Sequence, residues 1–258
     1  MMHKRVVFPR FLNCLLLSTL LSWSAFAEKS AQTVINLTNH APSALTPFNA
    51  KYSVHRGNLT LGKVKRQLTQ LSDDKFVFSY MSDLSFLILS DKRKESAEIQ
   101  LIDGQIRPIK YLYKREGTGS NKRTTLKFNH QTRHVFDGIK GKQIECDETI
   151  DWYDQISYQL QMKLDIEQGK SDLTYYLIDS KKREKLYQFE KVAAEQLVTP
   201  AGTFDTIKFE RVLSNKSRST QVWIAPKLGN LLVRVRQEKE GSEQADAILE
   251  SVTFNAIN

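Results

Sequence analysis

The sequence predicts a mainly β protein, with a strongly curved antiparallel sheet or open β-barrel and one packed amphipathic helix at about residues 151–168. Three observations lead to this fold class. Apolar and polar residues alternate over most of the chain, which is typical of strands with one buried face. Short turn signals separate these runs. One segment instead repeats its apolar residues every three to four positions, as helices do.

The alternation begins at Phe48, where apolar residues at 48, 50, 52 and 54 are separated by polar ones. Gly62 indicates a bulge or bend in the next run. Further along, Asp103-Gly104 lies between two alternating runs and is a strong signal of a β-hairpin. Because long antiparallel strands would leave exposed edges, we expect the sheet to curl on itself.

The helical segment spans residues 151–168. Trp152, Ile156, Leu160 and Leu164 recur at helical spacing, and Gly169 stands where a helix commonly ends. Either acidic residue at 151 or 154 could begin the helix as its N-cap. We therefore predict an amphipathic helix that packs its apolar stripe on the sheet.

Residues 86–89, Phe-Leu-Ile-Leu, are apolar at every position. A strand of this composition has no face suited to solvent. Either the helix covers one of its faces, or one face lines an apolar cavity. In the second case the candidate ligand-binding residues are Phe76, Phe78, Tyr80, Phe86 and Ile88.

The first 27 residues have the zones of a secretory signal peptide. Basic residues precede an apolar stretch at 11–23, and Ala25-Phe26-Ala27 forms a site that signal peptidase reads. The stretch is shorter than the ~20 residues that span a bilayer, so an uncleaved anchor is disfavoured, and Cys14 is misplaced for a lipoprotein. We predict cleavage after Ala27, a periplasmic location and no transmembrane segment in the mature chain.

Residues 28–46 contain few large apolar side chains and are predicted to form a flexible arm. The remainder, residues 47–258, is predicted to be a single β-rich domain. Loss of the signal peptide lowers the formal net charge from +9 to +6, because residues 1–27 contain three basic and no acidic side chains. This mild positive excess favours anionic surfaces, whereas export argues against a nucleic-acid partner. The basic clusters at 63–66, 92–94 and 181–183 fit solvated turns or strand edges; the alternative is contact with anionic lipid. Nothing in the sequence indicates the oligomeric state.

No catalytic, cofactor or metal site is predicted. His130 and His134 have a spacing that suits metal ligands on a helix, but we expect a hairpin turn there. Asp154 and Ser157 are three residues apart, which favours a helix cap over a catalytic pair. The mature chain keeps one cysteine, Cys146, so it has no internal disulfide, and we expect this thiol to be structural.

Several blocks of the sequence resemble DUF3108, a family of uncharacterised exported bacterial proteins. The resemblance covers about 48–254 and implies one β-rich envelope domain; it implies no activity, because the family has none assigned. Read physically, the blocks around Pro200 and Pro226 are turns and strand ends, so they are mainly architectural. The blocks are Phe48-Asn49-Ala50-Lys51-Tyr52-Ser53-Val54, Glu95-Ser96, Arg107-Pro108 with Tyr111 and Tyr113, Asp154-Gln155-Ile156-Ser157 with Leu160, Glu195 with Thr199-Pro200-Ala201-Gly202-Thr203-Phe204, and Trp223-Ile224-Ala225-Pro226-Lys227-Leu228 with Val233-Arg234.

Three functional hypotheses follow. The first is a periplasmic binding protein of the cell envelope that holds an amphipathic or lipid-like ligand in a β-lined cavity, since curved sheets can enclose one ligand. The second is a non-catalytic interaction or structural module with a filled core, which docks on another envelope protein. The third is an unrecognised hydrolase. A ligand cavity would favour the first, and a compact core with a large exposed apolar patch would favour the second.

Overall fold

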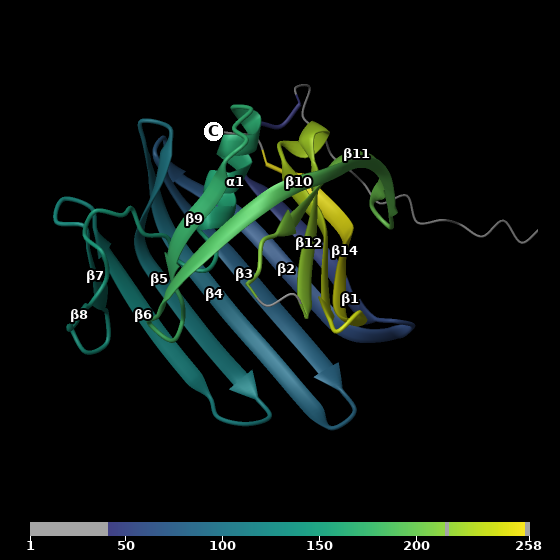
Figure 1. The fold of residues 1–258 in the computed structure, drawn as a ribbon, viewed down its shortest axis with the longest axis horizontal. Coiled ribbons are helices and arrows are strands. Elements are labelled where there is room, and N and C mark those ends of the chain that lie inside the picture. Colours follow the sequence, from purple (N-terminus) through teal and green to yellow (C-terminus); the bar gives the residue numbers. More distant parts are fainter. Residues whose placement is uncertain (1–40, 215–216, 256–258) are drawn as a thin grey trace, which may run out of the picture. The chain divides into compact units, whose positions relative to one another are not determined.

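The structure is a computed structural model that describes residues 41–214 and 217–255. These residues form antiparallel strands and one α-helix, so the predicted fold class is confirmed (Figure 1). The elements in chain order are β1 (Phe48–Arg56), β2 (Leu59–Ser72), β3 (Lys75–Phe86), β4 (Leu89–Ile102), β5 (Gln105–Gly117), β6 (Lys122–Asn129), β7 (His134–Asp137), β8 (Gln143–Ile144), α1 (Tyr158–Glu167), β9 (Leu173–Ile178), β10 (Glu184–Thr199), β11 (Gly202–Arg211), β12 (Arg218–Ala225), the 3-10 helix η1 (Pro226–Leu228), β13 (Leu231–Lys239) and β14 (Ser242–Phe254).

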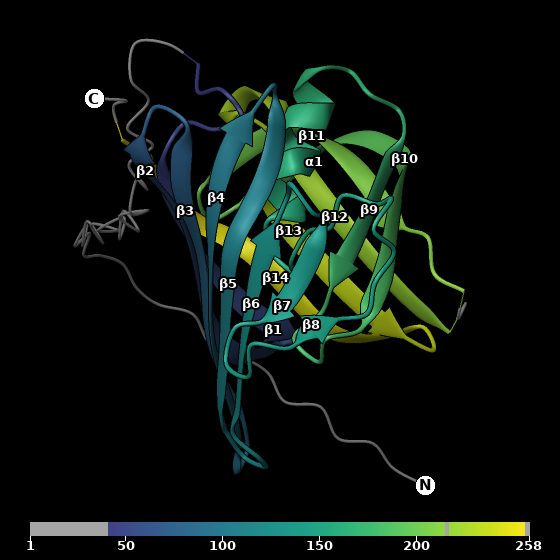
Figure 2. The same cartoon turned by 90° about the vertical axis from the view of Figure 1, so that its left-hand side faces the viewer.

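All the strands belong to one 14-stranded sheet in the order β8-β7-β6-β5-β4-β3-β2-β1-β14-β13-β12-β11-β10-β9. Two meanders, β1–β8 and β9–β14, are joined where β1 pairs with β14. The sheet is not closed, because β8 and β9 are its two edges. It bends so that its two halves face each other, with α1 between them (Figure 2).

Irregular pairing accompanies the bend. The register between β1 and β2 shifts after Val54, next to Gly62, as the sequence predicted. Gly62 has a φ of 148°, and a Cβ there would lie 2.0 Å from the backbone oxygen of Asp83 on β3. A side chain at this position would push the two strands apart, so glycine is needed where the backbones approach.

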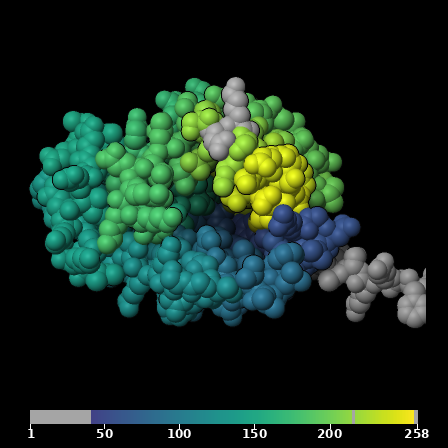
Figure 3. All heavy atoms as spheres, turned by 60° about the horizontal axis from the view of Figure 1, so that its bottom comes forward, coloured from purple at the N-terminus to yellow at the C-terminus, as the bar shows by residue number. Residues whose placement is uncertain are grey.

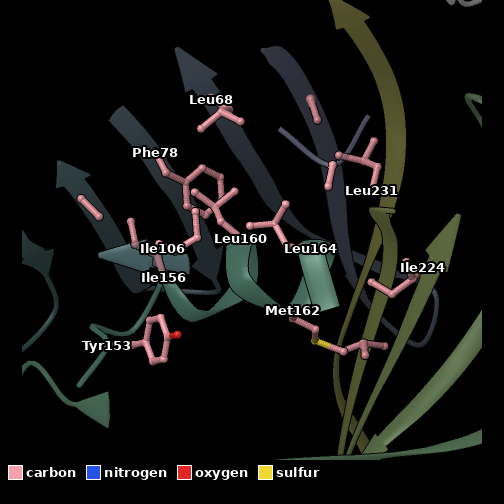
Figure 4. Packing of buried hydrophobic residues seen from close by; sticks show 14 of the residues in the cluster. Leu68, Phe78, Ile106, Tyr153, Ile156, Leu160, Met162, Leu164, Ile224 and Leu231 are labelled. Atoms are coloured by element: carbon pink, nitrogen blue, oxygen red, sulfur yellow. The ribbon is translucent and has the colours of Figure 1, made fainter. Parts of the chain in front are cut away.

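The helix differs from the prediction in length and in burial. α1 covers only Tyr158–Glu167, and Tyr153 instead forms a bridge with Leu177 on β9. Residues 160–165 are all buried, so α1 is not amphipathic in its surroundings. Leu160 and Leu164 point toward β2 and β3, and Met162 points toward the strand that carries Ile224 (Figure 4). The helix is covered on both sides because it lies inside the curled sheet.

Part of the predicted flexible arm is packed. Ala44 is fully buried, and its backbone N–H donates a 3.0 Å hydrogen bond to Oε1 of Glu167 at the end of α1. Gly229 lies so close that a Cβ there would be 2.3 Å from the carbonyl oxygen of Ser43. Residues 41–46 therefore differ from the expectation of a loose segment. The signal peptide and residues 28–40 lie outside the described residues.

The apolar run at 86–89 is also placed differently from the expectation. Leu87 and Ile88 form the two-residue turn between β3 and β4, and their side chains are 88% and 94% exposed. Neither α1 nor a cavity wall covers them. A turn was not expected because the run contains no Gly, Asn, Asp or Pro. Among the described residues, no helix has the length and apolarity needed to cross a bilayer.

Candidate functional site: a basic cavity inside the sheet

A cavity of about 430 Å³ lies on the concave side of the sheet. β1–β3 form one wall, β12–β14 form the opposite wall, and α1 bounds the cavity on the inside. Figure 3 shows the hollow from the end of the molecule at which β3 joins β4. Its apolar lining consists of Phe48, Tyr52, Val54, Val64, Tyr80, Leu84, Tyr158, Met162, Tyr187, Phe189, Val222, Ile224, Leu231, Leu232, Val235, Ala245 and Ala247.

Strand alternation and side-chain size together produce this space. On β3, Tyr80, Ser82 and Leu84 face the cavity, as their period of two requires. On the opposite wall, β14 contributes only Ala245 and Ala247, which are too short to reach across. α1 fills the space between the walls only toward one end of the strands. The volume falls within the usual range for small-molecule sites, ≈ 300–1,000 Å³.

The polar part of the lining is basic. Four cationic side chains contribute to the cavity surface, and none of the lining residues is Asp or Glu. Arg93 is exposed at the rim and pairs with Asp91 at 2.8 Å. The guanidinium of Arg211 stacks on the Tyr187 ring at 3.4 Å from its centroid. The other two cations, Arg66 and Lys163, are buried.

Lys163 extends from α1 into the cavity wall. Its side chain has no hydrogen-bond acceptor among the described residues, and Nζ lies 4.8 Å from the centroid of the Phe48 ring. Burial lowers the pKa of Lys163 to about 7, and the neighbouring charge of Arg66 contributes to this shift. Arg66 on β2 donates a short hydrogen bond to the side-chain oxygen of Gln159. Arg66 also lies over the Phe78 ring, 5.2 Å from its centroid, so aromatic rings and one amide partner the two buried cations.

A partly buried carboxyl group lies close to the cavity but does not line it. Glu95 on β4 is opposite Tyr80 and accepts a 2.5 Å hydrogen bond from the Tyr111 hydroxyl. Burial raises the pKa of Glu95 to about 7, and the charge of Asp154 acts in the same direction. Asp154 is itself fully buried, which raises its pKa to about 6. Both carboxyl groups therefore carry less negative charge near neutral pH than exposed ones would.

The sequence-predicted ligand-binding residues are divided among three environments. Tyr80 lines the cavity. Phe76 and Phe78 are buried near the start of β3, and Leu160 of α1 packs beside Phe78 (Figure 4). Phe86 and Ile88 are exposed at the β3–β4 turn, so the structure does not bring the five residues together.

The cationic lining was not predicted from the sequence. Arg66 follows the alternating Val64 and precedes Leu68, so its register on β2 places it on the buried face. That register was the available signal, and Arg66 was instead grouped with an exposed basic cluster. Lys163 lies between Met162 and Leu164, and only the position of α1 inside the sheet makes it buried.

The remaining sequence candidates have structural partners. His134 Nε2 is 2.8 Å from Glu148, and His130 Nε2 is 2.5 Å from the Pro108 carbonyl oxygen. Asp154 accepts from the backbone N–H of Ser157, and the Ser157 hydroxyl accepts from that of Asp154, which makes a turn before α1. Across 41–214 and 217–255, no group of three or more His, Cys, Asp or Glu side chains could hold a metal ion.

Cys146 is half-buried and carries a free thiol. Burial raises its thiol pKa, which leaves less of the reactive thiolate. This environment supports the expected structural role.

Two sequence blocks that carried the family resemblance meet on the other side of the sheet. Trp223 Nε1 on β12 donates a 2.5 Å hydrogen bond to Oε1 of Glu195 on β10. The side chains of Lys208 and Arg234 lie over the Trp223 ring at 4.8 Å and 4.9 Å. Val222, the preceding residue, lines the cavity. Since neighbouring side chains point to opposite faces, this cluster supports the wall from behind.

Residues 51–247 match the family described as "Protein of unknown function (DUF3108)". The chain belongs to the DUF3108 family. The match covers nearly all of the sheet, together with α1 and the Glu195–Trp223 contact. No curated protein matches this DUF3108 chain at a significant level.

The DUF3108 chain is similar to several solved structures. A β-barrel-like protein of the domain of unknown function DUF1849 from Brucella abortus superposes with a TM-score of 0.57 at 9% identity, over 83% of this chain and 100% of that one. A DUF1089 family protein from Pseudomonas aeruginosa gives a TM-score of 0.40 at 9% identity, over 66% and 87% of the two chains. A protein with a YmcC-like fold from Bacteroides fragilis gives 0.27 at 11% identity, over 82% and 96%. The first of these shows a shared barrel-like fold.

Proposed function

We propose that this DUF3108 domain is a non-catalytic periplasmic binding protein that holds an amphipathic, lipid-like ligand inside its curled sheet. The observation that carries the proposal is the cavity of about 430 Å³, lined mostly by apolar side chains but also by cations. Apolar surface in water costs about 25 cal/mol per Å², so a hollow of this kind favours an apolar occupant. The cationic groups suit a ligand that also has a polar end.

Co-purification tests this proposal. The full chain is expressed with its leader and purified from the periplasm, and native mass spectrometry is used to detect bound lipid. Ala247→Trp introduces a large side chain into the cavity, so we expect it to abolish ligand retention. Ala194→Trp, the same change at an exposed position on β10, is the control and should retain the ligand. A wild-type protein that carries no lipid and binds none added to it would contradict the proposal.

The apolar turn favours a second function, contact with an anionic lipid surface. Leu87, Ile88 and Leu89 are 88%, 94% and 51% exposed. Leu87 has a φ of 54°, a conformation that side-chain-bearing residues rarely adopt, whereas neighbouring hairpins use Gly57-Asn58 and Asp103-Gly104. Exposed cations follow the turn on β4, at Lys92 and Lys94. An apolar tip flanked by cations suits a membrane interface.

Vesicle sedimentation separates this function from protein docking. Wild-type protein should sediment with vesicles that contain an anionic phospholipid and much less with purely zwitterionic ones. Ile88→Asp should prevent sedimentation. Leu71→Asp should not prevent it, because this exposed leucine lies beside the β2–β3 turn, at the other end of β3 from Ile88. Equal sedimentation of both variants, or capture of an envelope protein without vesicle binding, would contradict lipid contact.

A further inference from the structure

The inner part of the cavity contains two cations that share no carboxylate. Arg66 and Lys163 are each only 5% exposed. They are close enough for the charge of Arg66 to disfavour the protonated form of Lys163. Cations that are buried without counter-ions are costly, and buried charges in proteins are normally paired.

Two cations outside the cavity show the usual pairing with carboxylates. On the outer face, Arg234 donates two hydrogen bonds to the carboxylate of Asp246, at 2.9 Å and 2.5 Å. Lys182 binds Asp137 at 2.6 Å. At the cavity wall, by contrast, neither Nζ of Lys163 nor the buried Nε of Arg211 has a hydrogen-bond acceptor among the described residues. Unpaired cationic donors are therefore concentrated at the cavity.

We propose that the ligand is an anionic amphiphile, whose phosphate or carboxylate group binds between Arg66 and Lys163 while its apolar chain extends toward the β3–β4 end. This inference rests on the proposed binding function and specifies its ligand class. An anion here supplies the acceptor that Lys163 lacks and a counter-charge for both cations: the ammonium of Lys163 adds a point charge, and the guanidinium of Arg66 can donate further hydrogen bonds beside the one to Gln159. Val54, Val64 and Leu84 then provide the surface for the chain.

The surroundings of Lys163 also predict a pH dependence. Its Nζ is influenced by the charge of Arg66 from β2 and by Glu167 on α1 itself, and it lies over the Phe48 ring from β1. Asn230 binds the backbone oxygen of Lys163, not its ammonium. Since only a protonated Lys163 attracts the head group, affinity should fall as the pH rises above the pKa of about 7.

Titration calorimetry on the delipidated full chain provides the test, with alkyl probes that share one chain length. An alkyl phosphate and an alkyl carboxylate distinguish the two head groups, and the corresponding alcohol is the neutral reference. Each anionic probe that fits should bind at least about 10-fold more tightly than the alcohol, because a hydrogen bond to a charged group contributes about 1.5–3 kcal/mol. Lys163→Met and Arg66→Met should each remove most of this preference, measured as the ratio of anion affinity to alcohol affinity in the same variant. Lys127→Met, at an exposed position on β6 outside the cavity, is the control.

The outcomes distinguish the inference from the function on which it rests. If the alcohol binds as tightly as both anions to wild-type protein, the anionic head group is wrong and the binding function stands. If no probe binds, both fail. An alkyl sulfonate, which does not titrate, should lose affinity between about pH 7 and about pH 9 in the wild type only. An equal loss in Lys163→Met would assign the dependence to another group. The wild-type comparison of head groups remains decisive even if a variant fails to fold.

Discussion

The two ends of β3 differ in what lies opposite them. At one end, Phe76 and Phe78 are buried, and α1 packs against this part of the sheet. At the other end, Ser82 and Leu84 face the cavity, and the strand then runs into the exposed turn. The alternation is the same along the whole strand. The difference shows that the core depends on the short helix, and that the sheet alone leaves an accessible interior.

One end of β3 therefore contributes mainly to stability and the other to binding, and four variants test this division. The largest loss of stability is expected from Phe78→Ala. The side chain of Phe78 is fully buried, so the change removes buried apolar surface and leaves a cavity under α1. We expect a loss of about 3–5 kcal/mol in the free energy of unfolding. Chemical denaturation measures this, and a loss below about 1 kcal/mol would contradict a packed role for this end.

The second variant, Lys163→Met, should increase stability. Burial lowers the pKa of Lys163 to about 7 in the folded protein, whereas an unfolded lysine titrates near its ordinary value. Between those two values the unfolded state binds more protons, so wild-type stability rises with pH, by at most about 1.4 kcal/mol per unit from this group. Methionine removes the penalty, and we expect a gain of about 1–3 kcal/mol near pH 7 and a smaller gain at higher pH. Denaturation at several pH values checks the sign.

The third variant, Leu84→Ala, addresses the open end. The side chain is only partly buried, so we expect a loss of less than about 1.5 kcal/mol. Ligand retention should fall nonetheless, because Leu84 lines the cavity. Mass spectrometry of the purified variant provides that measurement. A loss of stability as large as that of Phe78→Ala would show that both ends belong to the core.

The smallest effect is expected from Ile88→Asp. The side chain is 94% exposed, so a charge here meets water and not a packed interior. We expect a change in the free energy of unfolding within about 0.5 kcal/mol. Thermal unfolding followed by circular dichroism is sufficient, and extensive unfolding would contradict the exposed position of the turn.

The fold class could be predicted because strand alternation is a local pattern. The surroundings of the helix could not be predicted, because distant strands determine them. The spacing of Leu160 and Leu164 correctly indicated a helix. Its supposed polar face is also buried, because Gln161 accepts from the backbone of Ile106 at 2.7 Å and Asp165 accepts from the Tyr175 hydroxyl at 3.0 Å. Such compensation comes from distant strands, which a local pattern does not contain.

The candidate site was predictable only in outline. A curved sheet with an apolar interior followed from the period of two, and Tyr80 lies on its inner face. The apolar run at 86–89 was misleading, since composition alone does not distinguish a covered strand from an exposed turn. Arg66 and Lys163 could not be recognised as neighbours, because they are far apart in sequence and meet only when α1 enters the sheet.

The pairing of β1 with β14 has a consequence for how the molecule reaches its native state. Phe48 lies opposite Phe254, so the contact that joins the two meanders closes nearly the full length of the domain. Loop closure on this scale is slow, and proteins dominated by such distant contacts fold in the millisecond to second range or more slowly. Until β14 docks, β1 and β13 both present unpaired edges that can join other chains. Assembly of this domain is therefore expected to depend on protection from aggregation during the interval before its last strand arrives.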